Sequence, residues 1–231
     1  MTGEILRYLE TVEGERAARE VDPDFGRRVS AIKRYQQRRF ERTYSDLLAS
    51  SRYRAAALFF LEELYGPMDF RERDQQFARI VPKIASLFPA EISETVRDLA
   101  QLHATSEQLD SLMGRALRSA QVGPDEYHQT WRLVAQPQAR ELQLRLVIEI
   151  GQALDRFTHH TWITNALKLM RGPARAAGLS ALQAFLESGM TSFRAMHGAA
   201  DFLQTVRERE DRLMSALFAD DPAILAELPA P

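Results

Sequence analysis

Cysteine is absent from this chain of 231 residues, which excludes disulfide bonds, thiolate metal ligands and a cysteine nucleophile. Asn165 is the single asparagine, and the pairs Asn-Gly, Asp-Gly and Gly-Gly, which favour tight β-hairpins, do not occur. Glycine-rich phosphate loops and the Gly-x-Ser-x-Gly sequence of a nucleophile elbow are also missing. These absences argue against β-sheet folds and against several common enzyme classes.

Long hydrophobic runs are absent too. The longest extends from Ala55 to Leu61, seven residues, whereas a membrane-spanning helix needs about 20. Residues 1–19 carry charges every few positions and contain no apolar stretch of the length that a signal peptide requires. We therefore expect no membrane span and a cytoplasmic location.

Residues that end or start helices, by contrast, are frequent. Gly-Pro pairs at Gly66, Gly123 and Gly172 each follow a periodic apolar segment and predict helix ends. Asp22 and Asp221 each precede a proline, an arrangement typical of a helix start. The sequence predicts an all-α, multi-helix bundle-like domain of about ten helices and no sheet. The expected helices lie near residues 4–20, 24–49, 51–65, 70–88, 91–103, 106–121, 124–135, 138–157, 162–171, 174–197 and 199–218.

Helical phase predicts one further boundary. The apolar stripe around Ile150 and the stripe around Leu167 lie about 130° apart on a continuous helix. A straight helix could not bury both on one side, so we expect a break at residues 158–161. Pro82 should kink or divide its own helix.

We expect a single helical domain over residues 1–231, because no internal repeat or low-complexity linker divides the chain. It would comprise a peripheral N-terminal helix at 1–21, a core helical unit at 22–218 and a C-terminal tail at 219–231. Residues 228–231 are expected to be disordered.

An apolar heptapeptide, FFLEELY, occupies residues 59–65. Phe60 and Leu61 share one helix face with other apolar residues, while Phe59 points nearly opposite, so the segment should be central or interfacial. The candidates for this role are Phe59, Glu62, Glu63, Tyr65, Gly66 and Pro67. Glu62 and Glu63 diverge by about 100°, so they cannot act as a paired acid and base, and we expect each to find an arginine.

This heptapeptide resembles the defining motif of the FFLEELY-motif family of uncharacterised bacterial proteins. The resemblance extends to RYQQRR at 34–39 and YSDLL at 44–48, and later to PARAAG at 173–178 and LQAFLE at 182–187, so it covers roughly residues 32–218. Met190 stands where phenylalanine is expected. The resemblance implies a bacterial source and one continuous helical unit, and it implies no catalytic residue.

Basic residues concentrate between Arg27 and Arg54, where nine Lys or Arg face only two acidic residues. The patch candidates are Arg34, Arg38, Arg39 and Arg42, and the aromatics Tyr35, Phe40 and Tyr44 are interleaved with them. We interpret the segment as a solvated face or a complement to acidic helices of the same chain. Nucleic-acid binding through residues 27–42 stays an alternative, although the pI of 6.2 is low for such domains.

Glu210 lies on an apolar stripe with Val206 and Leu213, which predicts a buried carboxylate that must be paired or neutral. Arg207, one turn earlier, is the nearest candidate partner, so Arg207 and Glu210 are predicted to form a buried ion pair.

The histidines give a weaker indication of a metal or haem site. Asp155 with His159, and His197 with Asp201, have the spacing of two half-sites for a metal. No Glu-x-x-His or His-Glu-x-x-His occurs, however. His160 is expected to be a hydrogen-bonded core residue, with haem ligation as the alternative.

These observations predict a non-enzymatic helical binding or interaction protein, which binds itself, as in a homodimer, or another protein. The sequence identifies no catalytic, cofactor-binding or metal-ligating set. Three alternatives stay open: a bundle that binds an apolar or haem-like ligand, a metal-dependent enzyme that uses Asp and His side chains, and nucleic-acid binding.

Overall fold

The computed structural model describes residues 1–64, 70–87 and 89–230, with the backbone alone at 64 and 82–87. Within these ranges the chain forms twelve α-helices and one π-helical turn, η1, and no strand, which confirms the predicted all-α class. The elements are α1 Thr2–Val21, α2 Pro23–Thr43, α3 Ser45–Ala49, α4 Arg54–Phe59, η1 Phe60–Leu64, α5 Arg71–Leu87, α6 Ala90–Ala116, α7 Pro124–Val134, α8 Pro137–Thr158, α9 Thr161–Ala176, α10 Ser180–Ala195, α11 Ala200–Ala219 and α12 Ile224–Glu227.

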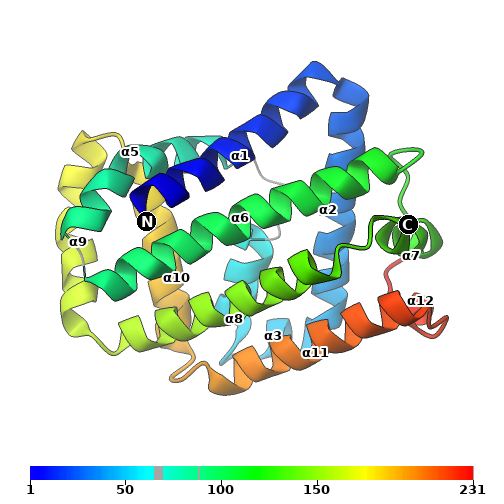
Figure 1. Ribbon diagram of the computed structural model, residues 1–231. Helices are drawn as coiled ribbons and strands as arrows, with labels where there is room; N and C mark the ends of the chain where they lie inside the picture. The colour runs from blue at the N-terminus through cyan, green and yellow to red at the C-terminus, as the bar shows by residue number, and fades with distance from the viewer. Residues whose placement is uncertain (65–69, 88, 231) are drawn as a thin grey trace.

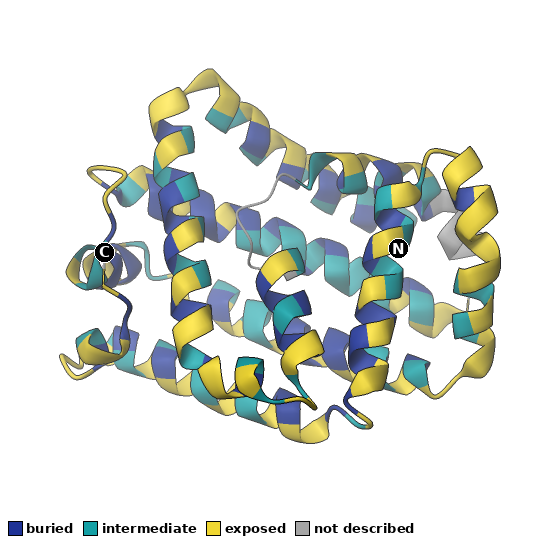
Figure 2. Cartoon of the chain, turned by 180° about the vertical axis from the view of Figure 1, so that it is seen from behind, coloured by how far each residue is buried: buried dark blue, intermediate teal, exposed yellow. Residues whose placement is uncertain are grey.

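Four long helices lie side by side in one layer, in the order α1, α6, α8 and α11 (Figure 1). Behind this layer, α2 packs on α6, and α10 packs on α8, α4 and α5. One end of the bundle is covered by α9, and the other holds α7 and α12 beside α11 (Figure 1). From behind, buried residues occupy the sides of the helices that face the interior (Figure 2). The candidate site lies between the layer and the helices behind it.

The FFLEELY segment is divided between α4 and η1 and lies in the largest core cluster. Phe59 and Phe60 are 5% and 2% exposed. The Phe59 ring lies 5.5 Å from that of Phe185 on α10, and the Phe60 ring lies 5.4 Å from that of Phe202 on α11. The segment therefore has a central position. Tyr65, Gly66 and Pro67, including the predicted helix end there, lie outside the described residues.

Several predicted helix boundaries are confirmed. The carboxylate of Asp22 accepts a hydrogen bond from the backbone N–H of Phe25 at 3.0 Å, so it caps α2 as expected. The break predicted from helical phase is present, since α8 ends at Thr158 and α9 begins at Thr161.

The helix end predicted at Gly172-Pro173 is wrong, because α9 continues through Pro173 to Ala176. Gly172 has no Cβ to clash with the proline ring, which relaxes the usual restriction on the residue before proline. The carbonyl of Leu169, which Pro173 cannot satisfy, belongs to a residue that is 78% exposed. The true end follows at Gly178, whose φ of +66° and N–H bond to the Arg175 carbonyl form a left-handed cap.

Two other predicted boundaries are also wrong. The helices expected at 91–103 and 106–121 form one helix, α6, which ends at Ala116. Thr105 and Gln108 have the spacing of a capping box, which is typical of a helix start. They do not interrupt α6, because the buried stripe of Leu102, Leu109 and Met113 continues at helical spacing across that point. The helix expected at 24–49 divides at Tyr44 into α2 and α3.

Both termini pack on the bundle. Although α1 was expected at the periphery and lies at the surface, it packs along α6 and buries Ile5, Leu9 and Val12. At the other end the expected disorder is wrong for Leu228 and Pro229, which are buried. The hydroxyl of Tyr35 on α2 donates a hydrogen bond to the Pro229 carbonyl at 3.0 Å, which fixes this segment against the helix.

No helix in the described parts of the chain is long and apolar enough to cross a membrane.

Gly114 sets how closely α6 approaches α2, which leads to a prediction. A Cβ at this position would lie 2.4 Å from Cγ2 of Val29 and 3.1 Å from its backbone nitrogen. We therefore expect Gly114→Ala to lower the free energy of unfolding by about 1 to 3 kcal/mol in urea titrations. The matched control is Gly14→Ala in α1, where nothing lies within 4 Å of the added Cβ. This control should raise stability by up to about 1 kcal/mol, and equal effects of the two changes would contradict the packing argument.

Candidate functional site

A cavity lined by ionisable side chains lies between the front layer and the helices behind it. This charged chamber has a volume of about 110 Å³. It receives side chains from helices across the whole chain, including α2, α5, α6, α8 and α11. Its ionisable lining residues, tyrosine aside, are Lys33, Arg39, Glu63, Arg73, Asp74, His103, Glu107, Asp110, Arg140 and Glu210.

Glu107 on α6 is a buried carboxylate of the charged chamber that pairs with two cations. It lies 2.5 Å from Nη1 of Arg19 on α1 and 2.5 Å from Nζ of Lys33 on α2. Burial alone would raise the pKa of Glu107, but the charges of Lys33 and Arg19 lower it to about 2. The residue therefore stays ionised and holds three helices together.

Asp74 on α5 forms a second cluster. Its Oδ2 lies 2.5 Å from Nη2 of Arg16 and 2.8 Å from Nε2 of His103. Burial opposes ionisation of Asp74, but hydrogen bonds and charges from His103, Arg73 and Arg16 hold its pKa below the ordinary value. This carboxylate also stays charged and links α1, α5 and α6.

Asp110 lies one turn after Glu107 on α6 and has a different environment. Its nearest cation is Lys33, whose Nζ is 3.9 Å from Oδ2 and is already bonded to Glu107. Burial raises the pKa of Asp110 to about 6, and the negative charge of Glu107 acts in the same direction. Asp110 is thus the carboxyl group in the charged chamber whose ionisation is least supported.

Arg140, near the start of α8, is a buried cation that forms no ion pair among the described residues. It is 4% exposed, and its guanidinium lies 3.3 Å from the centre of the Trp131 ring. Its Nε donates to the Ala135 carbonyl at 2.8 Å, while Nη2 is buried without a hydrogen-bond partner. Burial lowers the pKa of Arg140 to about 10, so the group remains charged at neutral pH.

A second cavity, the apolar chamber, lies under α9 and has a volume of about 190 Å³. Its lining comes from α4, η1, α5, α6, α8, α9 and α10 and consists almost entirely of aliphatic and aromatic residues. The inner face of α9 contributes Ile163, Ala166, Leu167 and Met170, the stripe whose phase predicted the break before α9. None of these four α9 side chains is fully buried.

The two chambers adjoin. Six residues line both of them and so form a common wall: Phe77, Leu99, Leu102, Val147, Leu182 and Phe185. All six are apolar, so the polar lining of one chamber changes to the apolar lining of the other across this wall.

The structure brings together three residues that the sequence singled out. Arg39, Glu63 and Glu210 all line the charged chamber. Arg39 pairs with Glu210, whose carboxylate also accepts a hydrogen bond from the Tyr44 hydroxyl at 2.7 Å. Glu63 pairs with Arg73 at 3.2 Å, as expected for a glutamate beside arginines, whereas Glu62 is exposed.

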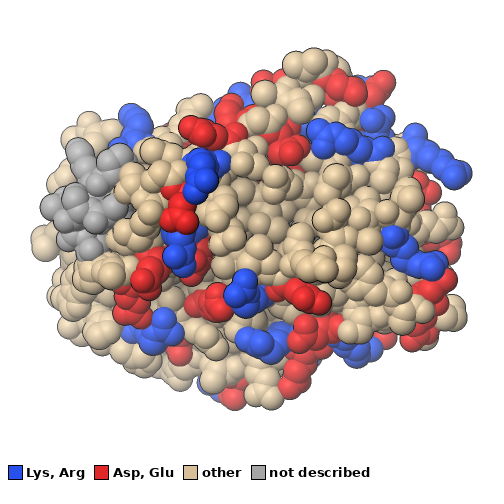
Figure 3. All heavy atoms as spheres, in the orientation of Figure 1, with Lys and Arg blue, Asp and Glu red and all other residues tan. Residues whose placement is uncertain are grey.

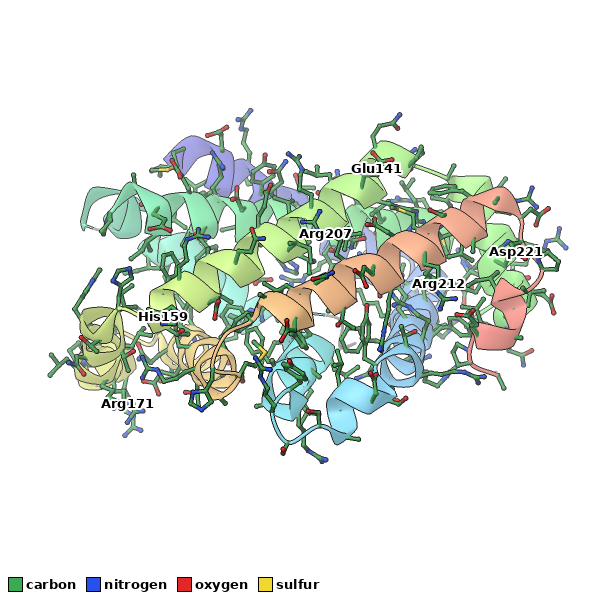
Figure 4. All side chains as sticks on the ribbon, turned by 90° about the horizontal axis from the view of Figure 1, so that it is seen from below. Glu141, His159, Arg171, Arg207, Arg212 and Asp221 are labelled. Carbon is green, nitrogen blue, oxygen red and sulfur yellow. The ribbon has the colours of Figure 1, made fainter. Side chains whose placement is uncertain are left out.

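The predicted partner of Glu210 was wrong. Arg207 is exposed, in a groove between α8 and α11 on the face shown in Figure 4. The stripe on α11 indicated that Glu210 faces inward. It carried no information about which neighbouring helix would face it, and that helix is α2.

The four arginines of the predicted basic patch do not share one environment. Arg34, Arg38 and Arg42 are exposed, whereas Arg39 is 5% exposed and faces the interior. The interleaved aromatics Tyr35, Phe40 and Tyr44 are at most 1% exposed, so they are not accessible for stacking on nucleic-acid bases. On the opposite, front face, basic and acidic side chains are intermixed (Figure 3).

The histidine candidates and their acidic partners are not among the described residues that line either chamber. His159 and His160 are exposed at the turn between α8 and α9, so the expectation of a core His160 is wrong. Asp155 accepts a hydrogen bond from the backbone N–H of Ala199, and Asp201 lies 3.4 Å from Arg52. Across the described part of the chain, no three acidic or histidine side chains converge as metal ligands would.

Sequence reasoning missed Asp74, His103, Glu107, Asp110 and Arg140. One signal was available for Glu107, which shares a face of α6 with Ala100, Ala104 and Ser111. A carboxylate within a stripe of small residues is typical of a close, buried helix contact, and such a contact demands counter-ions from the neighbouring helices. The sequence around Asp74 or Arg140 contains no comparable pattern that would predict their burial.

Comparison with known proteins identifies the family but no activity. Residues 15–224 match the family described as a domain of unknown function (DUF8198). The chain belongs to this family. The match includes every residue that lines the apolar chamber, and every residue that lines the charged chamber except Leu9. No curated protein and no solved structure matches the chain. A bacterial source and a cytoplasmic location stay predictions.

The pairing of Glu107 leads to a prediction. The folded pKa lies below the ordinary value of 4.5, so its stabilising contribution is present above pH 4.5 and is lost as the pH falls towards 2. We expect Glu107→Gln to lower the free energy of unfolding at neutral pH by about 3 kcal/mol, with the difference vanishing in acid. Glu91→Gln, which removes an exposed partner of Arg156, should cost less than about 1 kcal/mol. If urea titrations showed that both variants lose the same free energy of unfolding, the stabilising role of the buried Glu107 pairs would be contradicted.

Asp110 leads to a prediction of opposite sign. Its folded pKa of about 6 lies above the ordinary 3.8, so ionisation costs stability as the pH rises through this window. We expect Asp110→Asn to be more stable than the native chain in mildly alkaline buffer, by up to about 3 kcal/mol. The two proteins should converge below pH 3.8, where Asp110 is neutral in both the folded and the unfolded state. A variant that is less stable throughout the range would show that ionised Asp110 is supported in the folded protein.

Proposed function

We propose that this protein binds a small apolar molecule in the apolar chamber and performs no chemistry on it. The observation that carries the proposal is a cavity of about 190 Å³ with an almost wholly apolar lining. An engineered apolar cavity of about 150 Å³ stays dry and binds benzene, so a cavity of this size is suited to an aliphatic or aromatic guest.

The position of α9 supports the proposal. This helix packs mainly on α10 and α8 and has one buried residue, Ala174. Trp162 and Met170, which line the chamber, are still 49% and 47% exposed. Apolar side chains that both line a cavity and reach solvent provide a route of entry, because little buried contact is lost when α9 shifts.

The other predicted functions receive less support. Self-association was inferred from an outward-facing Phe59, and Phe59 is buried within its own chain. The proximal ligand of haem iron is typically a histidine, cysteine or tyrosine, and none of these is among the described residues that line the apolar chamber. Binding of a smaller apolar guest is therefore the form of the ligand-binding alternative that fits the geometry.

The test is calorimetric titration of the delipidated protein with decanol. We expect saturable binding, and we expect Ala166→Phe, which fills the chamber from α9, to weaken it by about tenfold or more. Ala176→Phe is the matched control, since it adds the same ring to an exposed position at the end of the same helix. Absence of binding, or equal affinity in the two variants, would show that the apolar chamber is not a binding site.

A further inference from the structure

Arg140 is the feature of the charged chamber that the fold leaves uncompensated. The other lining cations each have a carboxylate: Lys33 has Glu107, Arg39 has Glu210, and Arg73 has Glu63. Arg140 is as deeply buried as these, yet it has no such partner among the described residues. Removing a guanidinium from water without a counter-ion is costly.

The groups around Arg140 do not supply a counter-ion. Asp110 acts on it electrostatically but does not form an ion pair with it, and Lys33 already shares that carboxyl group. Its Nε donates to the neutral carbonyl of Ala135, and its guanidinium lies over the indole of Trp131, whose Nε1 is itself buried without a hydrogen-bond partner. Arg140 Nη2 and Trp131 Nε1 are therefore two buried donors that line the charged chamber and lack an acceptor.

The lining of α8 connects this cation to the apolar chamber. Arg140 and Val147 are seven residues apart, so they share a helix face, and Leu154 continues the same stripe. Arg140 lines the charged chamber, Val147 lines both, and Leu154 lines the apolar one. The stripe spans about 21 Å along the helix.

The neighbouring helix α6 shows the same change in polarity. Asp110 and Ser106 line the charged chamber, Leu102 lines both, and Ile92 lines the apolar one. Two adjacent helices thus present a polar-to-apolar gradient in the same direction. A guest that satisfies both ends must be amphipathic, with an acceptor-rich anionic group at the polar end.

We propose that the two chambers form one site for a medium-chain aliphatic carboxylate, with its head group on Arg140 and its chain across the common wall into the apolar chamber. The assignment rests on the proposed function, since the chain must occupy the apolar chamber. A planar guanidinium binds a carboxylate through two parallel hydrogen bonds, which an alcohol cannot reproduce. The site should therefore prefer the acid over the alcohol of equal length.

The experiment compares decanoate with decanol by calorimetric titration at neutral pH, below the concentration at which decanoate forms micelles. In the native protein we expect decanoate to bind about tenfold or more tightly than decanol. Arg140→Met should abolish this preference by weakening decanoate more than decanol, whereas Arg140→Lys should retain part of it. Arg145→Met, at an exposed position of the same helix, is the control and should leave the affinities for both ligands unchanged. Melting curves establish that each variant is folded.

The outcomes separate the two proposals. If both ligands bind and Ala166→Phe weakens both, but the native protein shows no preference or Arg140→Met preserves it, the head-group assignment is wrong and the apolar site stands. If neither ligand binds, or Ala166→Phe leaves both affinities unchanged, the proposed function is wrong, and the head-group assignment is overturned with it.

Discussion

The buried carboxylate of Glu107 is the constraint on which the rest of the structure depends. It lies on the buried face of α6, among small residues, and pairs with one cation from α1 and one from α2. A charge in that position is tolerable only if cations reach it from the neighbouring helices, and Arg19 and Lys33 do so. The pairing fixes the rotation of three helices about their own axes. Ser106 and Asp110, next to Glu107 in the chain and one turn after it, then face the charged chamber.

A core that contains so many paired charges cannot close as tightly as an apolar one. Guanidinium and carboxylate groups must keep the geometry of their hydrogen bonds, so the helices around the charged chamber are held apart. The six apolar residues of the common wall then face this chamber on one side and the space under α9 on the other. The two cavities thus share one wall, with charged pairs around one of them and α9, in which Ala174 alone is buried, over the other.

The fold class and most helix positions could be predicted because they depend on local signals: caps, periodicity and the absence of hairpin residues. The predictions were wrong where packing between helices determines a helix boundary or an ion-pair partner. Thr105 resembles a helix start, but continuous burial along α6 overrides it. For the site, the inward direction of Glu210 could be read from its own helix, whereas its partner Arg39 could not, because 171 residues separate them in the chain. Arg140 gave no signal, since burial of an arginine without a counter-ion is defined only by the neighbouring helices.

The FFLEELY segment acquires a physical meaning from its position between the two chambers. Phe59 and Phe60 line the apolar chamber, whereas Glu63, three residues later, lines the charged one and pairs with Arg73. In a regular α-helix the apolar and acidic halves would turn through successive faces at 100° per residue. The segment instead changes from α4 to the wider π-helical turn η1 at Phe60, and such turns often mark functional positions. The order along the segment, from Phe59 and Phe60 to Glu63, therefore matches the change in the cavity lining from apolar to charged, while Glu62 faces solvent.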